Sequence, residues 1–600
     1  GLGDVYKRQV VDLTESGHSD RNPSWALDGK AITYMTGRYG MKAQGSWGNQ
    51  EDVMLMVLDP EAWDNFNLSE EEQALKEKEE KDKENADNSD KSKDKKKSKK
   101  KDKKKSKDNI KDTEAESVDF DLDNRRYRMV RLTPMSSILG DYYLDKKGNK
   151  FYYVSVGSDG EANLMCRDLK KGDITVFAPG VNGGILPDDK GENLFILSYN
   201  GMSKISLADG KKEAIEFNAP YNRHPSLERA YIYDHMLNQV KNKFYDANLH
   251  GLDWDSIGSH YRRFLPYINN NRDFAILMSE VLGELNASHT GASAPSGWAS
   301  LPTATLGAYF NDSYTGPGLE VAEVLRRGPL DKKKVNIKPG DIITSIDGEP
   351  ILPGKDYYPM LEGKAGKKVI LGVKRAGAAT EDKVTVRPGY SDSELLYNRW
   401  VERNEHIVDS LSNGRIGYIH IKAMDTPSYL TTYDRLLGKY RNCDAVVVDT
   451  RYNGGGWLHN DIALLLGGKE YVRYMPRGRY VGSDPFSQWT KPSVMLVNES
   501  NYSDAHGTPY AYQTLGIGDV VGAPIPGTMT AVWWETQIDP NIIFGIPQVT
   551  SMDMNGNVLE NRQLTPDVVI YNQPGEIIIG KDAQLEGAVK HLLNKVPAKK

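Results

Sequence analysis

A buried strand that runs directly into a glycine-rich loop is the strongest constraint on the fold of this chain. Residues 444–457 read Asp-Ala-Val-Val-Val-Asp-Thr-Arg-Tyr-Asn-Gly-Gly-Gly-Trp, and a second apolar strand at 493–497 precedes Asn-Tyr-Ser-Asp at 501–504. Short apolar strands about one βαβ unit apart are typical of an α/β domain with a buried sheet. A glycine loop beside a serine that follows the next strand also places backbone N–H donors next to a nucleophile.

Length and composition indicate several soluble domains. The 600 residues exceed what one hydrophobic core organises, and no apolar run approaches the about 18 residues of a membrane span. The formal net charge of −6 is small for this length, so no overall field favours nucleic acid. Cys166 and Cys443 lie too far apart in sequence to indicate a disulfide framework or a zinc finger. We expect no cofactor and no metal.

A strand–turn–strand pattern recurs through the first third of the chain. It is seen at 25–34, 144–153 and 186–197, and the last two copies are each followed by a second hairpin. Their spacing of about forty residues is the period of four-stranded propeller blades. We predict a partial β-propeller at 10–220, the alternative being an ordinary run of hairpins. Because 1–9 fit no pattern, the chain is expected to be a fragment whose export signal could have been lost.

The first predicted blade is interrupted by an insert of low complexity at 69–113. Lys, Glu, Asp, Asn and Ser make up almost all of it, with a lysine-rich centre at 91–107. Such a segment cannot bury enough apolar surface to offset chain entropy, so we predict that it is disordered. A solvated loop is favoured over a tract that binds nucleic acid.

Three further domains are predicted after the propeller. Apolar residues at three and four spacings predict a small helical subdomain at 225–300. Short strands at 306–390 contain Lys-Pro-Gly-Asp-Ile-Ile-Thr-Ser-Ile-Asp-Gly at 338–348, which resembles PDZ domains, although no Gly-Leu-Gly-Phe loop for a terminal carboxylate is evident. Alternating strands and helices predict an α/β catalytic subdomain at 395–595.

Ser503 is the candidate nucleophile, and its base is not fixed by local sequence. A plain helix N-cap is the alternative reading of this serine. The N–H of Asp504 and one from the loop 454–456 are candidate oxyanion donors. A serine–lysine dyad of the class that carries its lysine shortly after the serine is excluded, because the next lysine after Ser503 is Lys581. The base is therefore sought among histidines, and the candidates are His289, His420, His459 and His506.

Three motifs together resemble one family. They are Ser288-His289, Arg-Tyr-Asn-Gly-Gly-Gly at 451–456 followed by Asn-Tyr-Ser-Asp at 501–504, and Leu-Glu-Asn at 559–561 followed by Thr-Pro-Asp at 565–567. With the domain order, they resemble the tricorn protease homologues of the tail-specific, carboxy-terminal processing peptidase superfamily. The resemblance covers nearly the whole chain.

The resemblance implies a serine peptidase with a crotonase-like α/β catalytic subdomain. Ser503 would be the nucleophile, His289 the general base, and Ser288 and Glu560 would orient the imidazole and stabilise its charge. Gly455 and Asp504 would supply the oxyanion hole. The resemblance also implies peptide substrates, a homo-oligomer and a cytoplasmic location, with the periplasm as the alternative if an export signal was lost.

Two departures from the family limit what is carried over. Asp504 is followed by alanine where the family usually has glycine, and no acidic group for basic substrate side chains is evident near the basic, aromatic stretch 471–480. We therefore predict a peptidase of unfolded or short peptides and do not carry over the trypsin-like preference of the family. The alternative is a catalytically weak scaffold that binds peptides through its PDZ-like and propeller domains.

Overall fold

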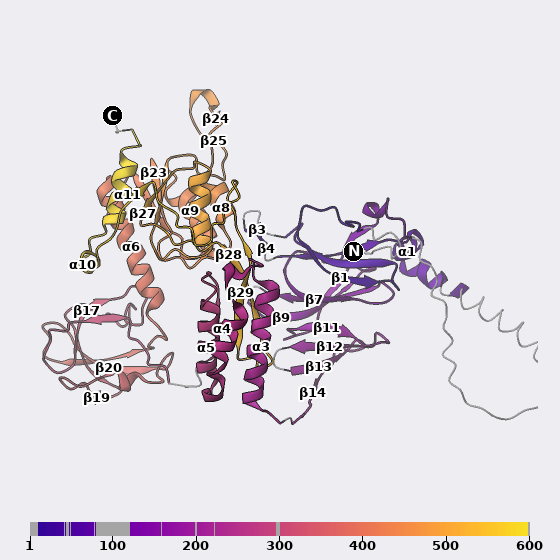
Figure 1. Cartoon of the computed structure of the whole chain (residues 1–600), viewed down its shortest axis with the longest axis horizontal. Coiled ribbons are helices and arrows are strands. Elements are labelled where there is room, and N and C mark those ends of the chain that lie inside the picture. The colour runs from indigo at the N-terminus through magenta and orange to yellow at the C-terminus, as the bar shows by residue number, and fades with distance from the viewer. Residues whose placement is uncertain are drawn as a thin grey trace, which may run out of the picture. The chain divides into compact units, whose positions relative to one another are not determined.

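The computed structural model of the chain describes residues 10–40, 42–43, 47–48, 50–76, 78–79, 120–157, 159–198, 201–220, 222–295 and 301–597. The chain divides into two compact units, Gly1–Tyr221 and Asn222–Lys600 (Figure 1). Within the described ranges, no helix is both long enough and apolar enough to cross a membrane.

Three four-stranded antiparallel sheets make up most of the first unit. The predicted repeats are confirmed as hairpins, because 25–34, 144–153 and 186–197 fall in the pairs β1–β2, β7–β8 and β11–β12. Each sheet has the strand number of a propeller blade, and a closed propeller stays a prediction. The elements are β1 (Asp20–Ala26), β2 (Ala31–Thr36), β3 (Lys42–Ala43), β4 (Trp47–Gly48), β5 (Asp52–Val57), α1 (Pro60–Phe66), β6 (Met129–Arg131), β7 (Ile138–Leu144), β8 (Lys150–Val156), β9 (Ala162–Asp168), β10 (Ile174–Ala178), β11 (Gly184–Pro187), β12 (Asn193–Ser198), β13 (Gly201–Ser206) and β14 (Lys212–Ile215).

The start of the insert predicted to be disordered is helical. Residues 70–76 form a helix, and Ser69 and Glu72 make reciprocal side-chain-to-backbone hydrogen bonds at its N-terminus. This capping box stabilises a first turn that composition alone does not reveal. The prediction is therefore wrong for 70–76, and the lysine-rich centre at 91–107 lies outside the described residues.

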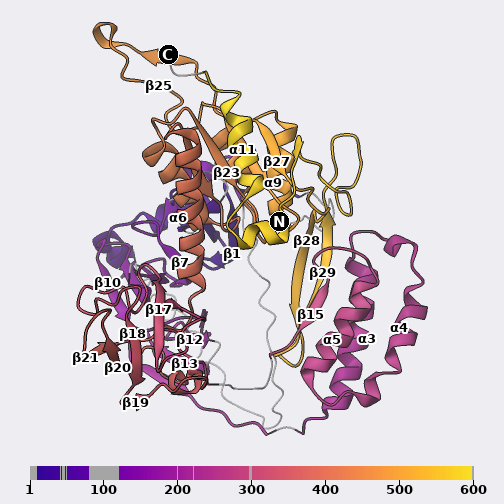
Figure 2. The same cartoon turned by 90° about the vertical axis from the view of Figure 1, so that its left-hand side faces the viewer.

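The predicted helical subdomain packs against strands from the far end of the sequence. Its helices share one core with Ile542, Phe544 and Ile546, and Figure 2 shows β28 and β29 alongside β15 and these helices. Since β15 pairs with β29, segments about 250 residues apart form one sheet. The elements are α3 (Pro225–Lys243), α4 (Trp254–Arg262), α5 (Asn271–Gly283), β15 (Gly291–Ser293), β28 (Thr530–Thr536) and β29 (Ile543–Thr550).

A six-stranded sheet follows, where the sequence resembles a PDZ domain. Its strands surround an apolar core that includes Val321, Ile343 and Leu371. They are β16 (Ala308–Phe310), β17 (Leu319–Val324), β18 (Ile342–Ile346), β19 (Glu349–Pro350), β20 (Val369–Lys374) and β21 (Glu381–Val386).

A five-stranded parallel sheet forms the predicted α/β subdomain. Every residue of β22, β23 and β26 is buried, as expected for a parallel sheet covered on both faces. The strands, in spatial order, are β22 (Ile416–His420), β23 (Ala445–Asp449), β26 (Ser493–Val497), β27 (Asp519–Gly522) and β30 (Val568–Val569). A short hairpin, β24 (Val472–Tyr474) and β25 (Gly482–Asp484), lies between β23 and β26 in sequence.

Helices cover the two faces of this sheet with separate apolar cores. α6 (Ser393–Ser412) and α11 (Ala583–Leu593) pack on one face, and α7 (Thr426–Asp434), α8 (His459–Leu466) and α9 (Asp504–Thr514) pack on the other. A short helix, α10 (Pro574–Ile578), precedes α11. The carboxyl ends of neighbouring parallel strands meet at one edge, and this edge carries both the glycine loop after β23 and the serine after β26.

Candidate active site

Ser503 lies on a strained turn between β26 and α9. Its backbone has φ 57° and ψ −125°, a conformation that residues other than glycine rarely adopt. Its side chain makes no capping hydrogen bond to the helix, so reading this serine as a plain helix cap is wrong. The backbone N–H donates instead to Thr528 Oγ1 at 2.9 Å. A strand, a strained serine and a helix follow one another in this order, which is the arrangement of a nucleophile elbow.

Hydrogen bonds fasten the serine turn to the glycine loop. The Tyr502 N–H donates to the Asn453 carbonyl at 3.0 Å, and the Asn501 side-chain amide donates to Thr450 Oγ1 at 2.9 Å. Asn453 and Asn501 are buried. The two loops therefore behave as one structural element.

Gly455 lies directly against the serine. A Cβ atom at this position would lie 2.6 Å from Ser503 Cβ and 3.0 Å from the Asp504 nitrogen, and its φ is +98°. Only glycine fits, since both the space and the backbone conformation exclude a side chain. The Gly455 N–H donates to Asn453 Oδ1 at 2.8 Å, so an oxyanion at this position would share the donor with Asn453.

A buried arginine anchors the start of the glycine loop. Arg451 is 1% exposed and forms ion pairs with Asp449 at the end of β23 and with Asp582 before α11. Multiple charge-assisted hydrogen bonds offset the cost of burying the guanidinium. They also fix where the chain leaves the sheet.

The carboxylate of Asp504, the residue after Ser503, faces α8. Its Oδ2 accepts the His459 N–H at 3.0 Å and its Oδ1 contacts His459 Nδ1 at 2.5 Å. This hydrogen bond raises the pKa of His459. The pair holds the Asp504 peptide in place beside the nucleophile, at the N-terminus of a neighbouring helix.

Ser288, His289 and Glu560 form a hydrogen-bonded cluster. Glu560 accepts the Ser288 N–H at 2.5 Å and the Ser288 hydroxyl at 3.0 Å. Ser288 Oγ lies 2.9 Å from His289 Nδ1. The structure thus brings these three predicted residues together, although Glu560 lies beyond the PDZ-like segment and most of the parallel sheet in sequence.

Two further residues hold the imidazole, and sequence reasoning missed both. Thr530 Oγ1 lies 2.9 Å from His289 Nδ1. The Tyr502 hydroxyl accepts the His289 backbone N–H at 2.7 Å, and the two ring centroids are 4.8 Å apart. Thr530 starts a strand and belongs to no local motif, so no sequence signal marks it as a site residue. Tyr502 could have been found, because it stands directly before Ser503.

Burial shifts the two titratable groups of this cluster in opposite directions. It lowers the pKa of His289, so the imidazole is neutral at neutral pH and can accept a proton. Burial raises the pKa of Glu560, which is 5% exposed, while hydrogen bonds from Ser288 counteract part of that rise.

Tyr502 connects the imidazole cluster with the turn that carries Ser503. It contacts His289 and immediately precedes Ser503, which lies against Gly455. In the part of the chain that the structure describes, no hydrogen bond joins Ser503 to His289. Hydrogen bonds of catalytic pairs often tighten only once substrate is bound.

The other candidate histidines have structural partners. His420 bridges the Tyr397 hydroxyl and the Arg451 carbonyl, and His459 pairs with Asp504. His506 is 1% exposed and accepts the Thr528 N–H, and burial lowers its pKa to about 4. The His506 backbone N–H donates to the Ser503 carbonyl at 2.8 Å, but within the described ranges none of the three imidazoles hydrogen-bonds to the Ser503 side chain.

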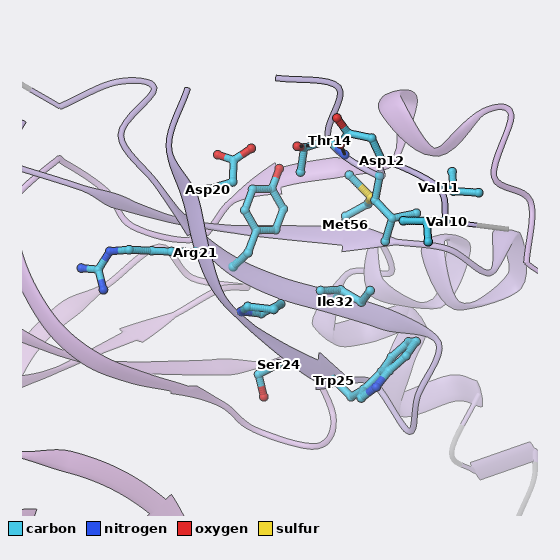
Figure 3. A pocket seen from close by; sticks show the side chains of 13 residues that line it. Val10, Val11, Asp12, Thr14, Asp20, Arg21, Ser24, Trp25, Ile32 and Met56 are labelled. Carbon is cyan, nitrogen blue, oxygen red and sulfur yellow. Dashed lines mark hydrogen bonds between the residues drawn. The ribbon is translucent and has the colours of Figure 1, made fainter. Parts of the chain in front are cut away.

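Two cavities lie away from Ser503. A pocket of about 450 Å³ in the first unit is lined by Trp25, Ile32, Met56 and their neighbours (Figure 3), and it contains none of the predicted site residues. Another pocket, of about 550 Å³, lies in the second unit, and its lining includes Glu560 and His250. Among the described residues, no group of three His, Cys, Asp or Glu side chains is arranged to hold a metal ion.

Three family models match the second unit in succession. They are the tricorn protease C1 domain at 225–283, the tricorn protease PDZ domain at 318–389 and peptidase family S41 at 415–570. Our own division into 225–300, 306–390 and 395–595 remains a proposal.

Curated relatives agree with these models. The chain is 28% identical over 387 residues to tricorn protease homolog 1 of Streptomyces coelicolor, covering 62% of this chain and 36% of that protein. It is 25% identical over 392 residues to the tricorn protease of Thermoplasma volcanium, covering 61% and 36%. The chain thus spans little more than a third of the length of these relatives.

The fold is also that of a solved tricorn structure. A crystal structure of the tricorn protease superposes with a TM-score of 0.75 at 18% identity, covering 99% of this chain and 56% of that one. With segments that match the tricorn C1, tricorn PDZ and peptidase family S41 models in succession, and curated tricorn relatives over 61–62% of its length, the chain carries tricorn-type and S41 peptidase domains and is similar to the tricorn proteases.

Proposed function

We propose that the chain is a serine peptidase that hydrolyses unfolded or short peptides through Ser503, His289, Ser288 and Glu560. The observation that carries this is the placement of Tyr502. It contacts the hydrogen-bonded imidazole of His289 and directly precedes a strained serine whose side chain does not cap its helix. A serine that only caps a helix would not need a strained backbone, and an isolated surface histidine would not need the contact with Tyr502.

In the proposed reaction, Ser503 Oγ attacks the substrate carbonyl carbon while His289 Nε2 accepts its proton. Ser288 and Glu560 stabilise the imidazolium that forms. His289 then donates the proton to the leaving amine, and water hydrolyses the acyl-enzyme by the same route in reverse. The lowered pKa of His289 keeps the base neutral at the start of the cycle.

The oxyanion of the tetrahedral intermediate would be bound by the N–H groups of Asp504 and Gly455. Asp504 begins α9, where the helix dipole favours a negative charge. The Gly455 donor also bonds Asn453 Oδ1, so this amide would share or release it as the oxyanion forms. Donors fixed in advance contribute most to such catalysis.

Substrate delivery, assembly and location belong to the same proposal. A PDZ-like domain next to the catalytic sheet in sequence suits extended peptides. The family relationship supports a homo-oligomer in the cytoplasm, with the periplasm as the alternative.

A catalytically weak peptide-binding scaffold is the second candidate. Its support is the set of PDZ-like and propeller-type sheets, which take peptides without any reaction. Against it stands the chain of hydrogen bonds from the buried Glu560 through Ser288 to the His289 imidazole, which peptide binding by the other domains does not require.

Labelling with a fluorophosphonate probe separates the two candidates. The peptidase predicts labelling that is lost in Ser503→Ala and His289→Ala but kept in Ser500→Ala, an exposed serine of the same loop. Hydrolysis of a mixed peptide library should follow the same pattern, because members of one catalytic unit are not additive. Hydrolysis retained in Ser503→Ala would exclude the proposed nucleophile, and damage by His506→Ala alone would exclude His289 as the base.

A further inference from the structure

Thr530 makes the same contacts to the imidazole as Ser288 does. Its Oγ1 lies 2.9 Å from His289 Nδ1 and 2.8 Å from Ser288 Oγ, and the residue is 7% exposed. Three polar atoms, two hydroxyl oxygens and one ring nitrogen, are therefore mutually within hydrogen-bond distance. Each edge of this triangle is a hydrogen bond only if one of its two atoms donates a proton along it.

The protons of this triangle can be assigned from its outer partner. Glu560 accepts the Ser288 hydroxyl proton at 3.0 Å, so Ser288 Oγ can act only as an acceptor towards Thr530 and His289. If His289 Nδ1 lacked a proton, Thr530 would have to donate to it. The Thr530–Ser288 contact of 2.8 Å and the His289–Ser288 contact of 2.9 Å would then contain no proton.

The alternative assignment supplies a proton for each contact of the triangle. His289 Nδ1–H donates to both hydroxyl oxygens, Thr530 shares its proton between Ser288 Oγ and, at 3.3 Å, the Ser288 carbonyl, and Ser288 donates to Glu560. Nε2 is then left with its lone pair, which is the form that a general base needs. The carboxylate is reached from the imidazole by two parallel routes, directly through Ser288 and through Thr530 followed by Ser288.

We propose that Thr530 is a positioning residue that extends the set Ser288, His289 and Glu560, holding the proton on His289 Nδ1 and the ring in the orientation that serves Ser503. This inference rests on the proposed peptidase function. A ring held by one acceptor can rotate about its side-chain bonds, whereas two acceptors from different segments define its plane. Ser288 belongs to the helical segment and Thr530 to β28, so the clamp spans both.

Thr530→Val removes the hydroxyl at nearly constant volume and provides the test. Thr550→Val is the matched control, because Thr550 pairs with Thr530 across β28 and β29 and its hydroxyl has no hydrogen-bond partner among the described residues. The full chain is assayed for kcat and KM on one library peptide between acid and neutral pH. Melting curves check that each variant folds.

Thr530→Val should lower kcat by about 10- to 100-fold with little change in KM, as expected for a lost hydrogen bond to a charged group. The acidic limb of kcat/KM should move to lower pH, since imidazolium loses an acceptor. Thr530→Ser should restore both, and Thr550→Val should match the wild type.

A wild-type kcat and pH profile in Thr530→Val would overturn the inference, as would a loss that Thr530→Ser does not restore. If the valine variant does not fold, Thr530→Ala takes its place with the same criteria. The proposed function fails separately, through hydrolysis that persists in Ser503→Ala, so the two failures are distinguishable.

Discussion

Glu560 accepts hydrogen bonds from both the backbone N–H and the hydroxyl of Ser288, although 272 residues separate the two in sequence. The contact joins a short turn after α5 to the loop that follows β29. It buries a carboxyl group that is linked to the His289 imidazole through the Ser288 hydroxyl. The arrangement exists only when the helical subdomain and the C-terminal segment are folded together.

Glu560→Gln keeps the shape of this contact and removes its charge. We expect kcat to fall by at least about tenfold, because the imidazolium of His289 loses its negative partner. In the wild type, the acidic limb of kcat/KM should lie below the ordinary histidine pKa of 6.5, since burial lowers the pKa of His289. Activity measured against pH checks both statements. Glu499→Gln, an exposed residue near the nucleophile, is the control, and equal effects of the two variants would exclude a role for the Glu560 charge.

Tyr502→Phe removes the acceptor of the His289 backbone N–H. His289 has φ +63°, so its peptide is strained and depends on such partners. An unsatisfied amide costs about 1–3 kcal/mol, and we expect slower labelling by the fluorophosphonate probe together with a lower melting temperature. Tyr452→Phe, on the exposed side of the glycine loop, should change neither quantity. A Tyr502→Phe protein that labels at the wild-type rate would show that the phenol does not hold the base.

Gly455→Ala introduces a methyl group directly against Ser503. The new Cβ would lie 2.6 Å from Ser503 Cβ, and the residue would have to keep φ +98°. We expect labelling of Ser503 to be lost while the sheet remains folded, because the clash falls on the turn. Gly454→Ala is the matched control, since a Cβ there meets nothing within 4 Å. Labelling of Gly455→Ala at the rate of Gly454→Ala would contradict the close approach seen here.

Much of this arrangement could be predicted from sequence, for identifiable reasons. Strands such as Ala445–Asp449 are continuous apolar runs, and the glycine loop and serine follow them directly. Sequence could not reveal that β29 pairs with β15 and completes the core of the helical subdomain, because that pairing is non-local. Thr530 was missed for the same reason. The helix at 70–76 was missed because the prediction rested on the composition of the whole insert, whereas the helix is stabilised by a capping box of two residues at its start.

Arg451→Met tests the anchor of the glycine loop. The substitution leaves Asp449, which is fully buried, without its charged partner, and breaking a buried ion pair from one side costs about 3–5 kcal/mol. We expect a clearly lower melting temperature and weaker probe labelling, since the loop that contacts Ser503 starts at this residue. Arg441→Met, an exposed arginine, should melt as the wild type does. A wild-type melting curve for Arg451→Met would contradict this, because it would mean that the fold loses no stability when Asp449 and Asp582 are left without the guanidinium.

His506→Asn tests a source of acid sensitivity that is independent of catalysis. Burial lowers the pKa of His506 to about 4 in the folded chain, against 6.5 for a free imidazole. The unfolded chain therefore binds more protons between these values, and folding stability falls as the pH falls from 6.5 to 4. The asparagine side chain of this variant can accept the Thr528 N–H without titrating.

Melting temperatures measured across that range should fall less steeply in His506→Asn than in the wild type. His260→Asn, at an exposed histidine of α4, is the control and should leave the slope unchanged. Parallel slopes for wild type and His506→Asn would place the acid sensitivity elsewhere. Glu560 acts in the opposite sense. Burial raises its pKa, so the folded chain binds this proton more readily than the unfolded chain, and the group stabilises the fold as the pH falls. Because Glu560 is unchanged in both proteins, the difference between their slopes isolates the histidine.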